Sequence, residues 1–147
     1  MMSTRAAGDS AEHRSAEAEM LAVFGARLGV TLAGKTYPIP GGAKLQIDGV
    51  SERPPILCEA CAHQGSPKAG QKRKIIADAF KLVYADKLLG RTFRKVILLA
   101  DEDAAAAFKG QTWVAAAFER LGVEGAVVNL LAETRAGLQA AQVRQRR

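Results

Sequence analysis

The pattern of hydrophobic and polar positions predicts alternating helices and strands along most of the chain. Apolar residues recur at helical spacing in some segments, and shorter apolar or alternating segments lie between turn signals rich in glycine and proline. The predicted elements, in chain order, are a helix over 11–28, strands over 34–39, 44–50 and 56–63, a helix over 71–89, a strand over 95–100, a helix over 101–121, a strand over 125–131 and a helix over 132–143.

The order of these elements predicts an α/β fold with a mixed sheet flanked by helices. Short turns join the first three strands and favour an antiparallel meander. The later strands are separated by helices, and the apolar segment 95–100 fits a strand buried on both faces. No linker or repeat divides the chain, so we expect one domain over residues 11–147. Residues 1–10 are rich in Ser, Ala and Gly, which favours disorder.

Two aromatic side chains bear on how the helices pack. Phe80 follows Ile75 and Ala79 on the helix over 71–89 and is assigned to its apolar face. Trp113 is assigned to partial core or to an interface rather than to the stacking of nucleic-acid bases. Phe80 is therefore expected to pack against the rest of the fold, and for Trp113 partial core and interface both stay open.

Two carboxylates are predicted to face each other on neighbouring strands. Alternation along the strand over 56–63 places Glu59, Cys61 and His63 on one face and leaves an apolar opposite face. A hairpin with the preceding strand brings Asp48 close to Glu59. Two facing carboxylates repel each other, and a cation between them relieves the repulsion. The pair is therefore a candidate metal site.

The segment over 44–82 resembles the active-site core of the PD-(D/E)XK nuclease superfamily, the restriction-endonuclease-like fold. That superfamily carries an Asp at the end of one strand, then Asp or Glu, any residue and Lys on the next strand, followed by a helix. Asp48 matches the first acid and Glu59 the second, whereas Cys61 stands where the lysine would be. The resemblance implies an αβββαβ core, with the last helix, strand and helix as a C-terminal extension.

The resemblance also implies a metal-dependent nuclease that hydrolyses phosphodiester bonds. Asp48 and Glu59 would hold Mg²⁺ or Mn²⁺, which bind hard oxygen ligands and keep several waters. In the superfamily the first helix often lends a Glu to the metal site, and Glu17 is the candidate here. The alternative for Glu17 is an ordinary solvated helix carboxylate.

The helix over 71–89 offers replacements for the absent strand lysine, because in some members of the superfamily this lysine lies on the following helix. Lys74 is preferred as the catalytic lysine, ahead of Lys72 and then Lys68. A Gln early in this helix is typical of the superfamily, so Gln71 is expected to hydrogen-bond water or a carboxylate in the cleft.

The net charge of +6 favours an anionic partner, most simply nucleic acid, and the resemblance makes DNA the expected one. The candidate contacts are Lys68, Lys72, Arg73 and His63. A solvated side chain is the alternative for Arg73, and a histidine satisfied by a loop is the alternative for His63. Many nucleases of this fold act as dimers, so a homodimer is also considered.

Other chemistries have little support in the sequence. Cys58 and Cys61 lie three apart on a strand, so they point to opposite faces and are poorly placed to share a zinc ion or a disulfide. Phosphate-binding and dinucleotide-binding glycine motifs are absent. No apolar segment approaches the roughly 20 residues of a membrane helix, and the N-terminus has no signal-peptide pattern, so we expect a cytoplasmic protein without a membrane partner.

Two further interpretations stay open. One is a catalytically inactive protein of the nuclease fold that binds nucleic acid or a protein partner, which the missing strand lysine favours. The other is a small partner-binding α/β domain in which Asp48 and Glu59 are ordinary polar residues. Against the latter stands the cost of burying Glu59 in an apolar strand without a counter-ion.

Overall fold

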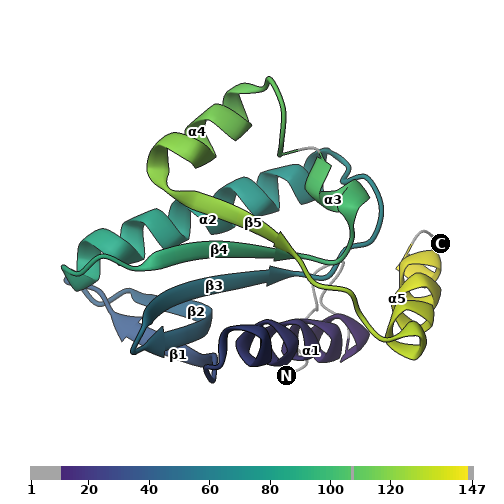
Figure 1. Ribbon diagram of the computed structural model, residues 1–147, viewed down its shortest axis with the longest axis horizontal. Helices are drawn as coiled ribbons and strands as arrows, with labels where there is room; N and C mark the ends of the chain where they lie inside the picture. The colour runs from purple at the N-terminus through teal and green to yellow at the C-terminus, as the bar shows by residue number, and fades with distance from the viewer. Residues whose placement is uncertain (1–10, 107, 146–147) are drawn as a thin grey trace.

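The computed structural model describes residues 11–106 and 108–145, so the disorder expected over residues 1–10 lies outside the described residues. The described residues form an α/β fold in which helices cover both faces of a central sheet (Figure 1). The elements are α1 (Ala11–Leu28), β1 (Ala33–Pro38), β2 (Lys44–Glu52), β3 (Pro55–Cys61), α2 (Ala69–Leu89), β4 (Arg94–Leu99), α3 (Glu102–Ala106), α4 (Trp113–Leu121), β5 (Val123–Val127) and α5 (Ala132–Gln145). None of the described helices is long and apolar enough to cross a membrane.

The sheet has five strands in the order β1-β2-β3-β4-β5 and is mixed, as predicted. The strands β1, β2 and β3 pair antiparallel because short turns join them. The strands β3, β4 and β5 pair parallel because α2 returns the chain between the first two, and α3 and α4 return it between the last two. The change from antiparallel to parallel pairing falls on β3, the strand that carries Glu59.

The two faces of the sheet are packed against different helices. Figure 1 shows α1 and α5 below the sheet and α2, α3 and α4 above it. Side chains from β3 divide between two cores in the predicted alternation: Leu57 and Cys61 lie in the core beneath α2, and Cys58 and Ala60 lie in the core against α1. Burial on both faces explains why β3 and β4 are almost entirely apolar.

The single helix predicted over 101–121 is wrong, because this segment forms two helices. α3 is one short helix, and Gly110 in the connection has a φ of +82°, where an L side chain would be strained. Thr112 then caps α4 by accepting a hydrogen bond from the Ala115 N–H at 3.1 Å. The many alanines favour a continuous helix, but the glycine and the cap divide it.

The last strand begins earlier than predicted and lies at an edge of the sheet. β5 covers Val123–Val127 instead of 125–131, and most of its side chains are exposed or half-buried. The apolar signal continues past the strand because Val128 and Leu130 are buried in the core against α1 and α5. The segment was therefore correctly identified as apolar, but its later residues pack below the sheet after the strand ends.

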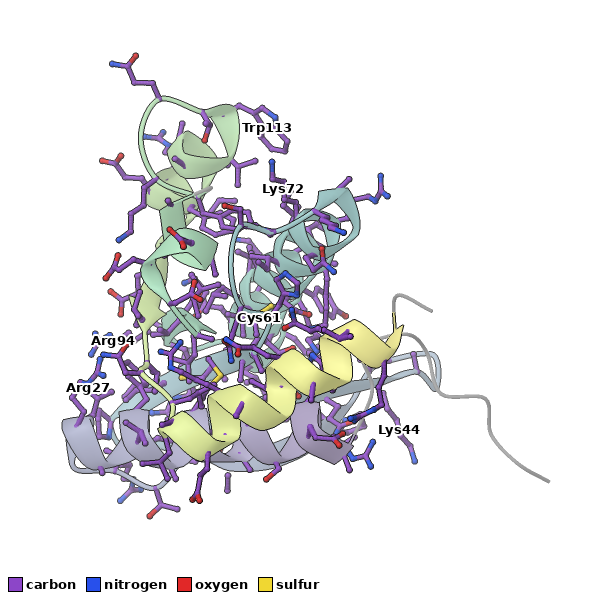
Figure 2. All side chains as sticks on the ribbon, turned by 90° about the vertical axis from the view of Figure 1, so that its right-hand side faces the viewer. Arg27, Lys44, Cys61, Lys72, Arg94 and Trp113 are labelled. Atoms are coloured by element: carbon purple, nitrogen blue, oxygen red, sulfur yellow. The ribbon has the colours of Figure 1, made fainter. Side chains whose placement is uncertain are left out.

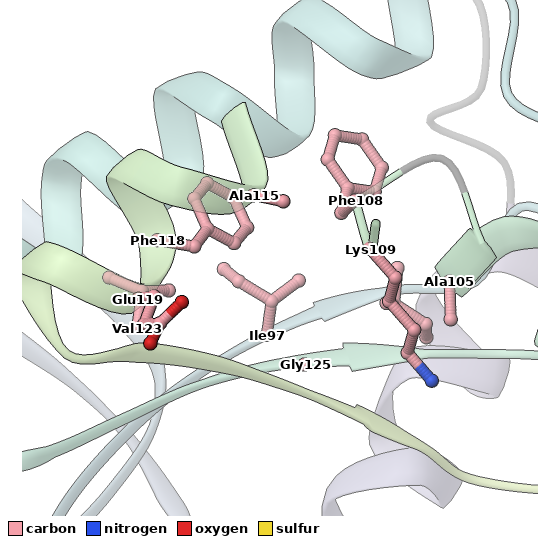
Figure 3. A pocket seen from close by; sticks show the side chains of 10 residues that line it. Ile97, Ala105, Phe108, Lys109, Ala115, Phe118, Glu119, Val123 and Gly125 are labelled. Carbon is pink, nitrogen blue, oxygen red and sulfur yellow. The ribbon is translucent and has the colours of Figure 1, made fainter. Parts of the chain in front are cut away.

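A cavity of about 180 Å³ lies between α4 and the sheet (Figure 3). Most of its lining is apolar, including the rings of Phe108 and Phe118, which stack with their centroids 5.8 Å apart. Lys109 and Glu119 are the two charged residues of the lining, and Figure 3 shows them at opposite ends. Its polar groups do not converge, so we assign it no ligand.

Candidate functional site

The candidate site forms where β2 and β3 stop pairing. Their ladder runs from Glu52↔Pro55 to Gly49↔Cys58, and the pairing of β1 with β2 is irregular at the same place. α1 packs closely here, since a Cβ on Gly49 would lie 2.5 Å from a methyl carbon of Leu21. The first residues beyond the ladder are Asp48 and Glu59, so both stand where two strands separate.

The two carboxylates take the place of the missing ladder bonds. The Asp48 N–H donates to Glu59 Oε2 at 2.7 Å, and the Ala60 N–H donates to Asp48 Oδ2 at 3.0 Å. Each acid thus satisfies a backbone donor on the other strand. This reciprocal pair of hydrogen bonds holds Asp48 and Glu59 together, as the sequence predicted from the hairpin.

The carboxylate of Glu59 is buried and has one cationic partner. It is 2% exposed, and its Oε1 forms an ion pair with Nζ of Lys81 from α2. Burial and the neighbouring charge of Asp48 raise the pKa of Glu59 from its ordinary 4.5 to about 7. The Lys81 ammonium and the Asp48 N–H oppose this rise. Glu59 is therefore a carboxyl group that changes charge near neutral pH.

A second ion pair lies one to two helical turns earlier on the same side of α2. Lys74 Nζ is 3.0 Å from Asp78 Oδ2, the i,i+4 pair that the sequence suggested. Burial lowers the pKa of Lys74, but the negative charges of Asp78 and Glu17 and the hydrogen bond to Asp78 oppose this, and the pKa lies above its ordinary value. Lys74, Asp78 and Lys81 form what we call the cleft flank of α2.

Cys61 lies close to this flank as a neutral thiol. It is 5% exposed, and burial raises its pKa to about 11, a rise that Lys74 opposes and that Asp78 and Glu17 increase. It therefore supplies no positive charge at the position where the superfamily has lysine. Cys58 packs in the opposite core, so the two cysteines lie on opposite faces of β3, as the strand alternation predicted.

The charge of Glu17, on α1, contributes to the raised pKa of both Lys74 and Cys61. Its role as a metal ligand stays a prediction. Among the described residues, no cluster of three or more His, Cys, Asp or Glu side chains has the arrangement of a metal centre. The two interlocked acids are thus the core of the candidate site.

The other predicted residues lie around the start of α2. The Gln71 Oε1 accepts a hydrogen bond from the Lys68 N–H at 2.9 Å, so its oxygen is engaged at the helix start. Donation from its amide N–H groups to water or a carboxylate stays a prediction. Lys68, Lys72 and Arg73 are exposed, and His63 is half-buried just after β3. Their roles in catalysis or in nucleic-acid binding stay predictions.

Lys81 is the site residue that the sequence reasoning did not select. The sequence does contain a signal for Lys81. Lys74, Asp78 and Lys81 recur at intervals of four and three residues, the spacing that places side chains on one side of a helix. Choosing among the lysines also required the position of α2 over the sheet, which brings Lys81 to Glu59.

Comparison with known proteins adds no assignment: no protein-family model, curated protein or solved structure matches the chain.

Proposed function

We propose that the chain is a metal-dependent nuclease that hydrolyses phosphodiester bonds, with Asp48 and Glu59 holding a divalent cation. One observation supports this above all: the two acids interlock at the point where β2 and β3 separate. The two acids replace two ladder bonds, but neutral side chains could also accept those bonds, and placing two neighbouring carboxylates at a buried and a half-buried position costs free energy. DNA is the expected substrate, on the basis of the net charge and of the resemblance.

The donor atoms suit Mg²⁺ or Mn²⁺. These ions prefer hard oxygen ligands, and Mg²⁺ often takes only one or two protein carboxylates and completes its shell with water and substrate phosphate. Oδ1 of Asp48 makes no hydrogen bond within the described part of the chain, so it is open to a ligand. Glu17 is the proposed third carboxylate. When bound, the cation would supply Lewis acidity and a water of lowered pKa.

Lys81 is the proposed replacement for the absent strand lysine. Its ammonium contacts Glu59 directly, and its side chain is 29% exposed, so it can also be reached from solvent. A cation at this position would stabilise the negative charge that develops on a phosphoryl group. Lys74 becomes the second candidate, because Asp78 already holds its ammonium.

The protonation of Glu59 should make cation binding and cleavage depend on pH. Its pKa of about 7 means that a proton competes for the same carboxylate that a cation would need. Cation binding and cleavage should therefore strengthen as pH rises through 7, while affinity falls up to about tenfold for each pH unit below it.

The direct test is a cleavage assay on plasmid, single-stranded DNA and RNA with Mg²⁺ or Mn²⁺. Asp48→Asn and Glu59→Gln should each reduce the rate at least about a hundredfold, and Lys81→Met by a comparable factor. Glu52→Gln is the matched control, because Glu52 is an exposed carboxylate on β2 that pairs with Lys35 and Arg91 and should not affect cleavage. Metal-dependent cleavage that survives in Asp48→Asn and Glu59→Gln would refute the assignment.

An inactive nuclease-fold protein that binds nucleic acid is the second candidate, because both oxygens of Glu59 are already engaged, Oε1 by Lys81 and Oε2 by the Asp48 N–H. This alternative predicts nucleic-acid binding that weakens steeply with salt, with no cleavage under any metal condition. The same assay, combined with a binding titration, separates the two functions.

A further inference from the structure

A side of α2 other than the one that carries Lys81 exposes aromatic rings. Phe80 is 77% exposed and Tyr84 39%, although only 5% of the residues in this chain are aromatic. Trp113, the first residue of α4, is 73% exposed. Phe80 was expected on the apolar face of the helix and is more exposed than expected, and the exposure of Trp113 excludes the partial core and leaves an interface. Exposed rings of this size favour a binding surface over a folding role.

Positive charge accompanies these rings. Arg73, Phe80, Tyr84 and Lys87 share one side of α2 by their helical spacing, and Lys72 lies next to them in the first turn. Figure 2 shows Lys72 and Trp113 at the same end of the molecule, and α2 and α4 are in contact. We call Phe80, Tyr84, Trp113, Lys72, Arg73 and Lys87 the outer face.

The charges of the outer face are unpaired and of one sign. Within the described part of the chain, none of its three cations forms an ion pair, unlike Lys74 and Lys81 on the cleft flank. The acids of α2 are engaged elsewhere: Asp78 with Lys74, and Asp86 with Lys95 and with the Phe93 N–H. The outer face therefore presents rings among free cations.

We propose that the outer face binds single-stranded nucleic acid, with bases stacked on Phe80, Tyr84 and Trp113 and with phosphates near Lys72, Arg73 and Lys87. Aromatic rings and cations in one groove or face are the two components of sequence-tolerant single-strand binding. Bases in a duplex already stack on one another, so rings of this kind distinguish a single strand from a duplex.

The positive charge of the outer face disfavours a second copy of the chain as its binding partner. In a symmetric dimer the same surface meets itself, so the cations of one outer face would meet the cations of the other. A polyanion meets them with opposite charge. This inference goes beyond the proposed nuclease function, because binding at the outer face requires neither a metal nor cleavage.

Trp113 provides the readout, since it is the only tryptophan in the sequence. Titration of the metal-free protein with oligo(dT), excited where tyrosine does not absorb, should quench its fluorescence as bases stack on the ring. Phe80→Ala and Tyr84→Ala should each weaken binding about fivefold or more, as expected for loss of one stacked base. Leu131→Ala removes an apolar side chain that is 60% exposed elsewhere and should leave binding unchanged.

The same titration at several salt concentrations tests the cations. Lys72→Ala and Arg73→Ala should each weaken binding and reduce the slope of log affinity against log salt by about one. Lys44→Ala is the matched control, because Figure 2 shows Lys44 at the opposite end of the molecule from Trp113. Binding of labelled oligo(dT) to Trp113→Leu, followed by anisotropy, should weaken as it does for Phe80→Ala.

Two results would overturn the proposal. In the first, the lysine and arginine variants lose affinity while the three aromatic variants bind like the wild type, which leaves only non-specific attraction of a polyanion. In the second, sedimentation shows a dimer that Phe80→Arg dissociates, which makes a second copy the occupant. Failure of the nuclease function is recognised separately, because Asp48→Asn and Glu59→Gln should still bind oligo(dT) normally.

Discussion

The cleft flank and the outer face of α2 differ in which kind of side chain is covered and which is exposed. On the cleft flank, two of the three charged side chains are largely covered: Asp78 is 14% exposed and Lys81 29%, whereas Lys74 is 56% exposed. The partner of Lys81, Glu59, is 2% exposed. On the outer face, the Phe80 ring is 77% exposed. Both arrangements invert the usual preference, in which aromatic residues are covered and charged residues are solvated.

Each inversion costs stability. Covering charges costs free energy unless they are paired, and an exposed phenylalanine forgoes about 1.5–3 kcal/mol of burial. The remaining side of the helix, with Ile75, Ala79 and Leu82 buried on the sheet, carries the folding role. We propose binding roles for the other two sides, and substitutions on each side should respond differently.

Among substitutions of charged residues, the largest effect on stability is expected from Lys81→Met, which leaves Glu59 buried without its cation. At about pH 8 the free energy of unfolding should fall by roughly 3 kcal/mol, because removing one partner exposes the other charge to the full burial cost. At about pH 5, where Glu59 holds its proton, the loss should be smaller. Urea unfolding of the wild type and Lys81→Met at both pH values measures this loss in the free energy of unfolding, with Lys74→Met as the control.

Lys74→Met breaks a pair whose lysine is 56% exposed and should therefore change stability by no more than about 1 kcal/mol. An equal loss for the two lysine variants, or a loss in Lys81→Met that does not depend on pH, would remove the distinction between the two ion pairs.

The second effect concerns the pH dependence of the wild type. Glu59 has a pKa of about 7 when folded and about 4.5 when unfolded, so the folded state binds the proton more tightly. This group therefore favours folding at low pH, and its contribution is lost as pH rises from about 4.5 to about 7. Between about pH 5 and pH 8, Glu59 should lower the free energy of unfolding by roughly 2–3 kcal/mol, a decrease absent from Glu59→Gln. Parallel stability profiles for the two proteins would contradict the raised pKa.

A smaller change is expected from Asp48→Asn. The amide oxygen of Asn can still accept from the Ala60 N–H, but the negative charge next to Glu59 is gone. The pKa of Glu59 should then fall by about one pH unit, since a like charge is one of its two causes. An NMR titration of the glutamate carboxyl carbons measures this, and an unchanged pKa would leave burial as the single cause.

The smallest effect is expected on the outer face. Phe80→Ala should change stability by about 0.5 kcal/mol or less, because the ring packs against little. Ile75→Ala, on the buried side of the same helix, should cost about 2–5 kcal/mol. Thermal unfolding compares the pair directly, and a large loss in Phe80→Ala would mean that the ring belongs to the core.

The regular part of the fold was readable from sequence because local patterns determine it. The alternation in β3 correctly divided Leu57 and Cys61 from Cys58 and Ala60, and the apolar stripe of α1 gave its bounds. The errors arose where tertiary packing or a single turn decides. Gly110 interrupts an alanine-rich segment, and β5 ends at Val127 although apolar residues continue beyond it.

The sequence predicts only part of the candidate site, because local spacing determines the acids but not their cationic partner. Strand alternation and a hairpin bring Asp48 and Glu59 together, and both follow from local spacing. The partner of Glu59 depends on how α2 crosses the sheet, which selects Lys81 over the lysines nearer the helix start. Gln71 also makes a local contact that its spacing did not indicate, because its oxygen accepts a hydrogen bond from the Lys68 N–H at the start of α2.

The most direct test of the central claim is a calorimetric titration with Mn²⁺, followed by Mg²⁺, on the wild type, Asp48→Asn, Glu59→Gln and the control Glu52→Gln. The interlocked acids predict one binding event that releases protons below about pH 7, persists in Glu52→Gln and disappears in both site variants. Absence of binding to the folded wild type, repeated with oligo(dT) present, would contradict a metal site at Asp48 and Glu59.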